Sequence, residues 1–310
     1  MMLDTKRRKY FELNICSGSK NVKNAVLEAA ILGYDVVAVN TVIGHSNEMA
    51  KKSKKKQMKN ELVLTSPIKL QITSPDLQKH KLCSAPKIIY RLTITLWTEQ
   101  DNIRELVAAA QSMYDIVALT PMTDAALIQC CQLGVSPDII SIDGYTEIGN
   151  DALKRLSTVP MNDTFVELLY YPCVGSSSST ARQSSIRLNQ SVVRAVRGRH
   201  VFVSCGSSET ACLRSPRDVL GFCSLMGLSE EQAHAALSRV CADLLFCAAR
   251  RRRQTLTKQR SSYTTKAVIS SDVVLPVAVI KRNIVEHAKR SIMSTNIKRP
   301  VKRQKNTNKA

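Results

Sequence analysis

The chain has 310 residues, and its 45 Lys and Arg against 25 Asp and Glu give a formal net charge of +20. This length is enough to bury one large hydrophobic core or two smaller ones. No apolar run approaches the roughly 18 residues of a membrane span, so we expect none. The basic residues after Met1 are not followed by an apolar segment, so we expect no secretory leader.

The positive charge is concentrated in two parts of the sequence. Residues 1–60 carry 12 Lys/Arg against 5 Asp/Glu, and residues 250–310 carry 17 against 2, whereas residues 61–249 carry 16 against 18. Basic appendages on a nearly neutral body suit a polyanion, because neutralising phosphates releases counterions without demanding rigid geometry. Nucleic acid is the predicted polyanion, and a membrane surface is the alternative.

The first part of the chain shows a pattern that recurs downstream. We predict a strand at residues 11–15, a helix at 21–32 that ends at Gly33, and a second strand at 35–39. A glycine just past a helix supplies the left-handed residue that satisfies the last carbonyls. Short strands that are wholly apolar are expected when helices cover both faces of a parallel sheet.

Residues 41–86 interrupt this pattern as a long insertion. Connections of this length in a compact domain are usually functional or disordered. The early part of the insertion is rich in lysine: Lys51, Lys52, Lys54, Lys55, Lys56 and Lys59. We expect this lysine cluster to contact RNA or DNA, and a solvated loop is the alternative.

The helix-and-strand pattern resumes after the insertion. Further strands are predicted at residues 88–96, 116–119, 138–142, 165–170 and 201–204. Further helices are predicted at residues 103–113, 124–133, 181–196, 216–226 and 229–249. About seven parallel strands joined by right-handed helical crossovers predict an α/β fold, a TIM-like (β/α) barrel that is open or closed.

The composition divides the chain into three parts. We expect residues 1–9 to be a flexible basic N-terminus, residues 10–249 to form the barrel domain, and residues 250–310 to be a basic, mostly disordered tail that folding does not need. Within the tail, the apolar residues 273–280 can pair or dock with a partner. The tail also has the spacing of a bipartite nuclear-import signal, a pattern that basic tails match by chance as well. Its members are Lys289, Arg290, Lys302, Arg303 and Lys305.

The residues expected at the barrel mouth form a poor catalytic set. Catalytic groups of a parallel barrel lie where the strands end, and the predicted strand ends offer one carboxylate, Asp143, and no histidine. We cannot assemble a metal-ligand set from the isolated histidines, so we expect neither metal nor cofactor. The loop at residues 204–208, Ser-Cys-Gly-Ser-Ser, can cradle a phosphate on its backbone N–H groups. The alternative is a turn that merely needs small residues.

Several segments are specific when their order and spacing are taken together. They are residues 29–40, 90–94, 114–118, 166–170, 198–204, 213–219 and 226–229. Together they resemble the thirty-kilodalton protein subunit of nuclear ribonuclease P and ribonuclease MRP, over about residues 11–245. The chain departs from that family at Asn162-Asp163-Thr164, where an Arg-Gly pair is usual, and at Gly221, where Asn is common.

The resemblance implies a barrel related to the PHP metal phosphoesterases, which carry His-x-His where this chain has Glu12-Leu13-Asn14. It also implies a noncatalytic, RNA-binding subunit that supports removal of the 5′ leader from precursor tRNA, and rRNA processing. The RNA subunit would carry out the cleavage. The implied partners are the ribonuclease P or MRP RNA, precursor tRNA indirectly, and other protein subunits, in the nucleus and nucleolus and without a membrane.

Beyond the lysine cluster, three arginines are candidate RNA contacts: Arg91, Arg182 and Arg214. Three other residues are candidates for structure and assembly: Gly206, Pro216 and Asp218. The guanidinium of Arg214 can pair bidentately with Asp218 or with an RNA phosphate.

Two other functions remain open at this point. The first is a metal-dependent phosphoesterase of the same barrel ancestry, which the scarcity of ligands disfavours. The second is a DNA-associated chromatin protein that uses the basic tail and needs no barrel-specific partner.

Overall fold

The computed structural model describes residues 9–269 apart from 19–20, 45–63, 133, 145, 147, 159–162, 176–177 and 208, and gives only the backbone for 255–269. Seven strands form a single sheet in chain order, and every neighbouring pair is parallel. The strands are β1 (Phe11–Cys16), β2 (Val36–Gly44), β3 (Lys87–Leu96), β4 (Ile116–Pro121), β5 (Ile139–Ile142), β6 (Phe165–Leu169) and β7 (Val201–Ser204). A parallel bridge between Ile15 and Ser207 brings the two edges together and nearly closes the barrel. The predicted TIM-like barrel is confirmed.

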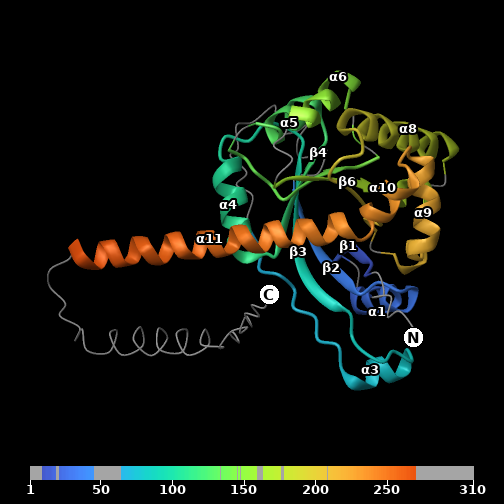
Figure 1. Cartoon of the computed structure of the whole chain (residues 1–310), viewed down its shortest axis with the longest axis horizontal. Helices are drawn as coiled ribbons and strands as arrows, with labels where there is room; N and C mark the ends of the chain where they lie inside the picture. The colour runs from blue at the N-terminus through green and yellow to red at the C-terminus, as the bar shows by residue number, and fades with distance from the viewer. Residues whose placement is uncertain are drawn as a thin grey trace, which may run out of the picture. The chain divides into compact units, whose positions relative to one another are not determined.

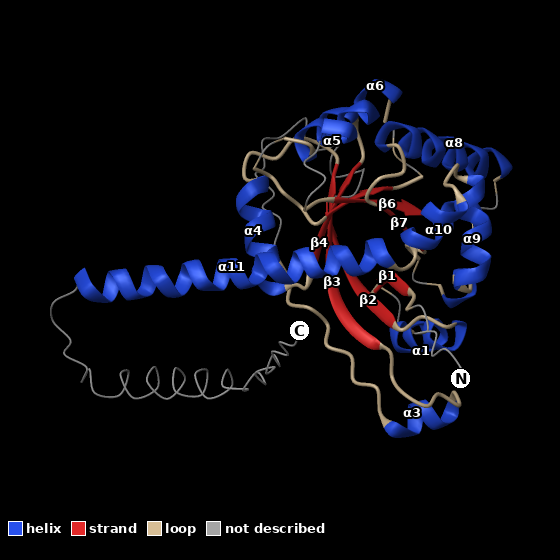
Figure 2. Ribbon diagram, viewed as in Figure 1, coloured by secondary structure: helices blue, strands red, loops and turns tan. Residues whose placement is uncertain are grey.

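Helices lie outside the strands, and those from α1 to α8 connect them (Figures 1 and 2). They are α1 (Val22–Leu32), α3 (Ser74–Lys79), α4 (Ile103–Met113), α5 (Asp124–Cys130), α6 (Asn150–Leu153), α7 (Tyr171–Val174), α8 (Ser179–Val196), α9 (Pro216–Leu225), α10 (Glu230–Ala236) and α11 (Arg239–Ile269). Gly33 ends α1 with φ +105°, as its place after the helix predicts. None of the helices in the described part of the chain has the length and apolar character that crossing a bilayer requires.

The core has two parts. One lies between the strands and the surrounding helices, and the other lies inside the barrel. The inner part is built from the first residues of the strands, such as Phe11, Val36, Phe165 and Phe202. Cys241 and Leu244 of α11 pack against these side chains, so α11 seals the N-terminal end of the barrel.

The last predicted helix, residues 229–249, is two helices in the structure, and the prediction of one is wrong. Leu237 and the end of α10 pack in the outer core, whereas Cys241 and Leu244 of α11 pack inside the barrel. The chain must therefore change direction between α10 and α11. The second helix also continues past residue 249, where we expected the domain to end, and the first compact unit extends to Leu256.

The described part of the insertion is attached to the barrel. The hydroxyl of Tyr114 donates to the carbonyl of Thr65 at 2.9 Å, and Asp76 at the start of α3 pairs with Lys23 of α1 at 2.6 Å. A capping box between Thr73 and Asp76 begins α3. The lysine cluster of residues 51–59 lies outside the described residues.

Candidate functional site

A buried ion pair occupies the interior of the barrel. Arg91 on β3 and Glu167 on β6 are both fully buried, and two nitrogens of the guanidinium donate to the two carboxylate oxygens at 2.6 and 2.5 Å. Arg91 Nη1 also donates to the carbonyl of Leu13 at 2.9 Å. Such a bidentate pair fixes both position and orientation, and its members have no contact with solvent.

Polar side chains from neighbouring strands complete a closed hydrogen-bond network around this pair. Asn40 Nδ2 donates to Asn14 Oδ1 at 2.7 Å, and Asn14 Nδ2 donates to Glu167 Oε1 at 3.2 Å. Thr93 donates to Asn40 Oδ1 at 2.8 Å and accepts from Arg91 Nε at 3.0 Å. The network satisfies groups that would be costly to bury alone, and it fixes the register of four strands.

The two buried carboxyl groups Glu12 and Glu167 have pKa values shifted in opposite directions. Burial raises the pKa of Glu12 to about 8, although the backbone N–H groups of Cys205 and Asn14 donate to its carboxyl group. Burial also acts to raise the pKa of Glu167, but the charge of Arg91 and hydrogen bonds from Arg91, Ser141 and Ser204 outweigh it and hold the pKa below its usual value. Glu167 is therefore the ionised partner, and Glu12 holds a proton at neutral pH.

These contacts correct the expectation for Arg91. We expected an RNA contact, but the side chain is enclosed and its donors are directed at protein atoms. Glu12 and Glu167 are two further buried carboxyl groups that the sequence did not predict. One signal was present in the sequence, since Arg91 and Glu167 carry opposite charges in the middle of largely apolar strands.

The guanidinium of Arg91 supplies the positive charge that balances the buried carboxylate of Glu167. In the part of the chain that the structure describes, no three His, Cys, Asp or Glu side chains are arranged to hold a metal ion. The arrangement can brace the barrel, because charge-assisted hydrogen bonds to Glu167 join β1, β3, β6 and β7, and a neutral hydrogen bond from Asn40 adds β2.

The loop after β7 is held by β1. The N–H of Cys205 donates to Glu12, and the N–H of Gly206 donates to the carbonyl of Asn14 at 3.1 Å. These donors are already used, which favours the structural turn over a phosphate cradle. Gly206 has φ +77°, and a Cβ there would lie 2.9 Å from a methyl carbon of Leu169, so the turn requires glycine.

Arg214 is held by backbone groups rather than by Asp218. Its Nη1 donates to the carbonyls of Ala211 and Leu213 at 2.8 and 2.9 Å. Asp218 instead accepts from the hydroxyl of Ser215 at 2.8 Å at the start of α9, where Pro216 is the first residue. The expected pair of Arg214 with Asp218 is therefore not formed.

The other predicted residues lie elsewhere. Arg182 is half-buried in the first turn of α8. The predicted import signal at residues 289–305 lies outside the described residues.

Aspartates tie the N-terminal ends of the strands together. Asp35, Asp115 and Asp138 each stand directly before a strand, and each carboxylate accepts a backbone N–H from the preceding strand or the residue before it. The donors are Tyr10, Tyr90 and Val117, at 2.8–3.0 Å. Two of these aspartates, Asp35 and Asp115, directly follow a tyrosine in the sequence.

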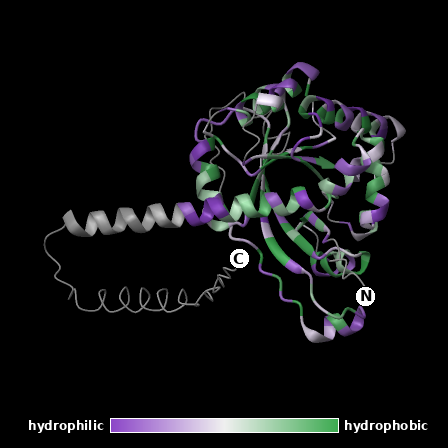
Figure 3. Cartoon of the chain, viewed as in Figure 1, coloured by the Kyte–Doolittle hydropathy of each residue, from purple (hydrophilic) through white to green (hydrophobic). Residues whose placement is uncertain are grey.

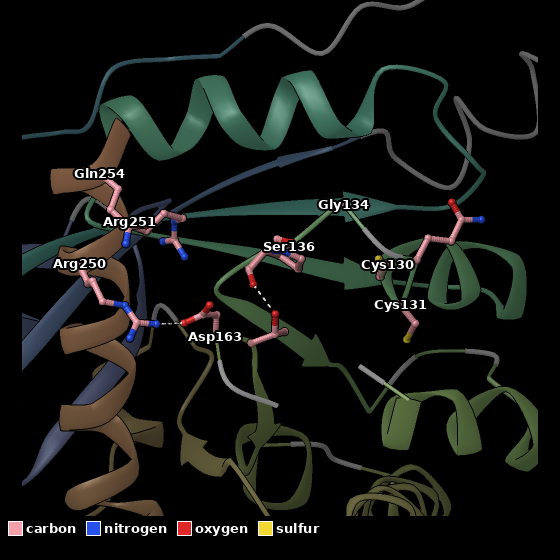
Figure 4. A pocket seen from close by; sticks show the side chains of 11 residues that line it. Cys130, Cys131, Gly134, Ser136, Asp163, Arg250, Arg251 and Gln254 are labelled. Carbon is pink, nitrogen blue, oxygen red and sulfur yellow. Dashed lines mark hydrogen bonds and ion pairs between the residues drawn. The ribbon is translucent and has the colours of Figure 1, made fainter. Parts of the chain in front are cut away.

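We call these three aspartates together with Asp163 the aspartate rim, and three consecutive arginines of α11 pair with three of its members. Arg250 pairs with Asp163, Arg251 pairs with Asp138, and Arg252 pairs with Asp115 at 2.8 Å. Figure 4 shows Arg250 directed from α11 towards Asp163. A cavity of about 340 Å³ remains between α11 and the loops, and its arginines are already paired with aspartates. We therefore interpret the rim as the attachment of α11 to the barrel.

The fold and the site define a TIM-like barrel with a buried ion pair in its interior and a helix that closes its N-terminal end. Comparison with known proteins places this barrel in a family. The family model for RNase P subunit p30 matches residues 9–253, and the chain belongs to that family.

Relatives of known identity agree with this assignment. The chain is 29% identical over 242 residues to the ribonuclease P protein subunit p30 of Mus musculus, covering 75% of this chain and 83% of the mouse protein. It is 28% identical over 168 residues to the probable ribonuclease P protein subunit 3 of Schizosaccharomyces pombe, covering 54% of this chain and 69% of the yeast protein. A chain in a cryo-EM structure of archaeal ribonuclease P with mature tRNA has the same fold, with a TM-score of 0.52 and 11% identity. That match covers 76% of this chain and 91% of the archaeal chain.

Proposed function

We propose that the protein is a noncatalytic, RNA-binding subunit of ribonuclease P, which supports removal of the 5′ leader from precursor tRNA by an RNA-based enzyme. The family match over residues 9–253 carries this proposal, because it spans the whole barrel. The buried pair of Arg91 and Glu167 supports the noncatalytic part, since it fills the interior with a protein cation.

The expected partners are the ribonuclease P RNA and other protein subunits, with precursor tRNA contacted through the assembly. Participation in ribonuclease MRP and in rRNA processing belongs to the same proposal. Nuclear and nucleolar location is supported by the family and by the basic clusters at residues 289–305. The lysine cluster at residues 51–59 and Arg214 remain proposed RNA contacts.

The noncatalytic role is tested by comparing two samples in a precursor tRNA cleavage assay with Mg²⁺. We expect the purified chain alone to give no cleavage, and an assembly purified through a tag on the same chain to release the 5′ leader. Metal-dependent cleavage by the pure chain, lost on substitution of Asp143, would show that the protein is itself a nuclease.

A further inference from the structure

One stretch of the barrel carries positive charge without any acidic residue. No Asp or Glu occurs between Glu167 and Glu209, and the basic residues there are all arginines: Arg182, Arg187, Arg194, Arg197 and Arg199. The body at residues 61–249 has 16 Lys/Arg against 18 Asp/Glu, so without these five it has 11 against 18. The near-neutral balance of the barrel therefore hides a segregation of charge along the sequence.

Helix α8 presents this charge on its outer side. Asn189, Val192 and Val196 are buried against the barrel, whereas Arg187 and Arg194 are exposed. These two arginines are seven residues apart, so they lie on the same side of the helix and about 10 Å apart along its axis. In Figure 3 this helix, labelled α8 in Figure 1, alternates between hydrophobic and hydrophilic residues, as one buried and one exposed side require.

The turn after α8 adds two more exposed arginines. Arg197 ends the helix with φ +55°, and both Arg197 and Arg199 are exposed. We call Arg187, Arg194, Arg197 and Arg199 the arginine face. Helix α8 is fixed by its buried side and by Gln190, which donates to the carbonyl of Leu225 at 2.9 Å. The guanidinium groups are therefore presented from a rigid support.

The arginine face differs from the arginines that hold the barrel together. Arg91, Arg250, Arg251 and Arg252 each pair with a carboxylate. None of the four members of the arginine face forms an ion pair with a residue that the structure describes. Their charge is available to an external anion.

We propose that the arginine face binds the phosphate backbone of RNA, and this assignment rests on the proposed RNA-binding function. Guanidinium groups bind phosphate bidentately and remain charged at every physiological pH. Helix α8 contains no aromatic residue on which a base can stack, so the contact reads phosphates rather than sequence.

The test measures the affinity of the full chain for ribonuclease P RNA transcribed in vitro, over a series of salt concentrations. The variant is Arg187→Gln/Arg194→Gln/Arg199→Gln, which keeps Arg197 because of its backbone conformation. The control removes three exposed charges elsewhere, Lys79→Gln/Lys87→Gln/Arg155→Gln. Since each lost phosphate contact lowers the slope of log K against log salt by about 0.7–0.9, we expect the slope of the variant to fall by about 2 and its affinity at low salt to fall at least about tenfold. The control should bind like the unaltered chain, and the thermal midpoints of all three should agree.

The outcomes separate this proposal from the one on which it rests. If the unaltered chain and the variant bind RNA with the same slope, the arginine face is not an RNA contact, although the chain still binds RNA. If the unaltered chain itself binds no RNA, both proposals fall. If the variant binds RNA normally but loses a protein subunit when the assembly is purified, the face binds an acidic protein, and the proposal is wrong.

Discussion

The attachment of α11 leads to a prediction about where the folded domain ends. A chain that stops at Ala249 keeps all of the apolar contacts of α11 inside the barrel but loses Arg250, Arg251 and Arg252. A chain that stops at Arg253 keeps these three arginines. Composition alone would give the two chains equal stability, since both lack the basic tail.

The three ion pairs differ in their expected contribution. The side chains of Arg250 and Asp163 are 49% and 55% exposed, and those of Arg252 and Asp115 are 36% and 34% exposed, so each pair contributes about 0–1 kcal/mol. Asp138 is 2% exposed, and removing its partner Arg251 leaves a buried charge that costs about 3–5 kcal/mol. At about 2–4 °C per kcal/mol, the chain that ends at Ala249 should melt about 10 °C below the one that ends at Arg253.

The loss should depend on pH in one direction. Burial raises the pKa of Asp138 and the charge of Arg251 lowers it, so the pKa rises further when Arg251 is removed. A carboxyl group whose pKa is higher in the folded state than in the unfolded state costs stability as the pH rises. The difference between the two chains should therefore be largest at neutral pH and should shrink towards about pH 4, where the carboxyl groups become protonated.

Calorimetry or urea unfolding of the two truncated chains and the full chain at pH 4 and pH 7 measures this effect. The single variants Arg251→Met and Arg250→Met are a matched pair, and only the first should approach the loss seen on truncation at Ala249. Equal midpoints for the two truncated chains at neutral pH would refute the role assigned to the aspartate rim.

The buried polar groups and the loop after β7 give three further predictions. Because the pKa of Glu12 is raised to about 8 in the fold, the carboxyl group costs stability as the pH rises from about 4.5 to 8, so Glu12→Gln should melt above the unaltered chain at pH 9 and lose that advantage at pH 5. Arg91→Met should lower the free energy of unfolding in urea by about 3–5 kcal/mol, because it leaves Glu167 buried and unpaired. Adding Glu167→Leu should recover much of that loss, and a double variant no more stable than the single one would contradict this. Gly206→Ala should cost about 1–3 kcal/mol, since it combines a positive φ with a close approach to Leu169, and an unchanged urea midpoint would show that the loop relaxes freely.

The sequence predicts the barrel well because its signals are local. Gly33 after a helix, Val36–Val39 as an apolar strand, and the same succession downstream need no knowledge of distant residues. The division between α10 and α11 has no such signal. It arises because successive apolar positions pack in two different cores, which only the closed barrel defines.

The interior site is determined by long-range contacts. Arg91 and Glu167 are 76 residues apart in the chain, and only the parallel register of the intervening strands directs both side chains inward. The aspartate rim could be predicted from the sequence only in part. The repetition of Tyr-Asp before a strand is visible in the sequence, but its pairing with the arginines of α11 depends on where α11 crosses the barrel.

The central claim is that this chain works as a protein subunit of ribonuclease P. Purification of the tagged full chain from cells that produce it, followed by sequencing of the bound RNA and a precursor tRNA assay, tests this most directly. We expect one dominant stable RNA in the purified assembly, and cleavage of the 5′ leader that is lost when that RNA is degraded. An assembly that lacks a dominant RNA and does not cleave precursor tRNA would contradict it.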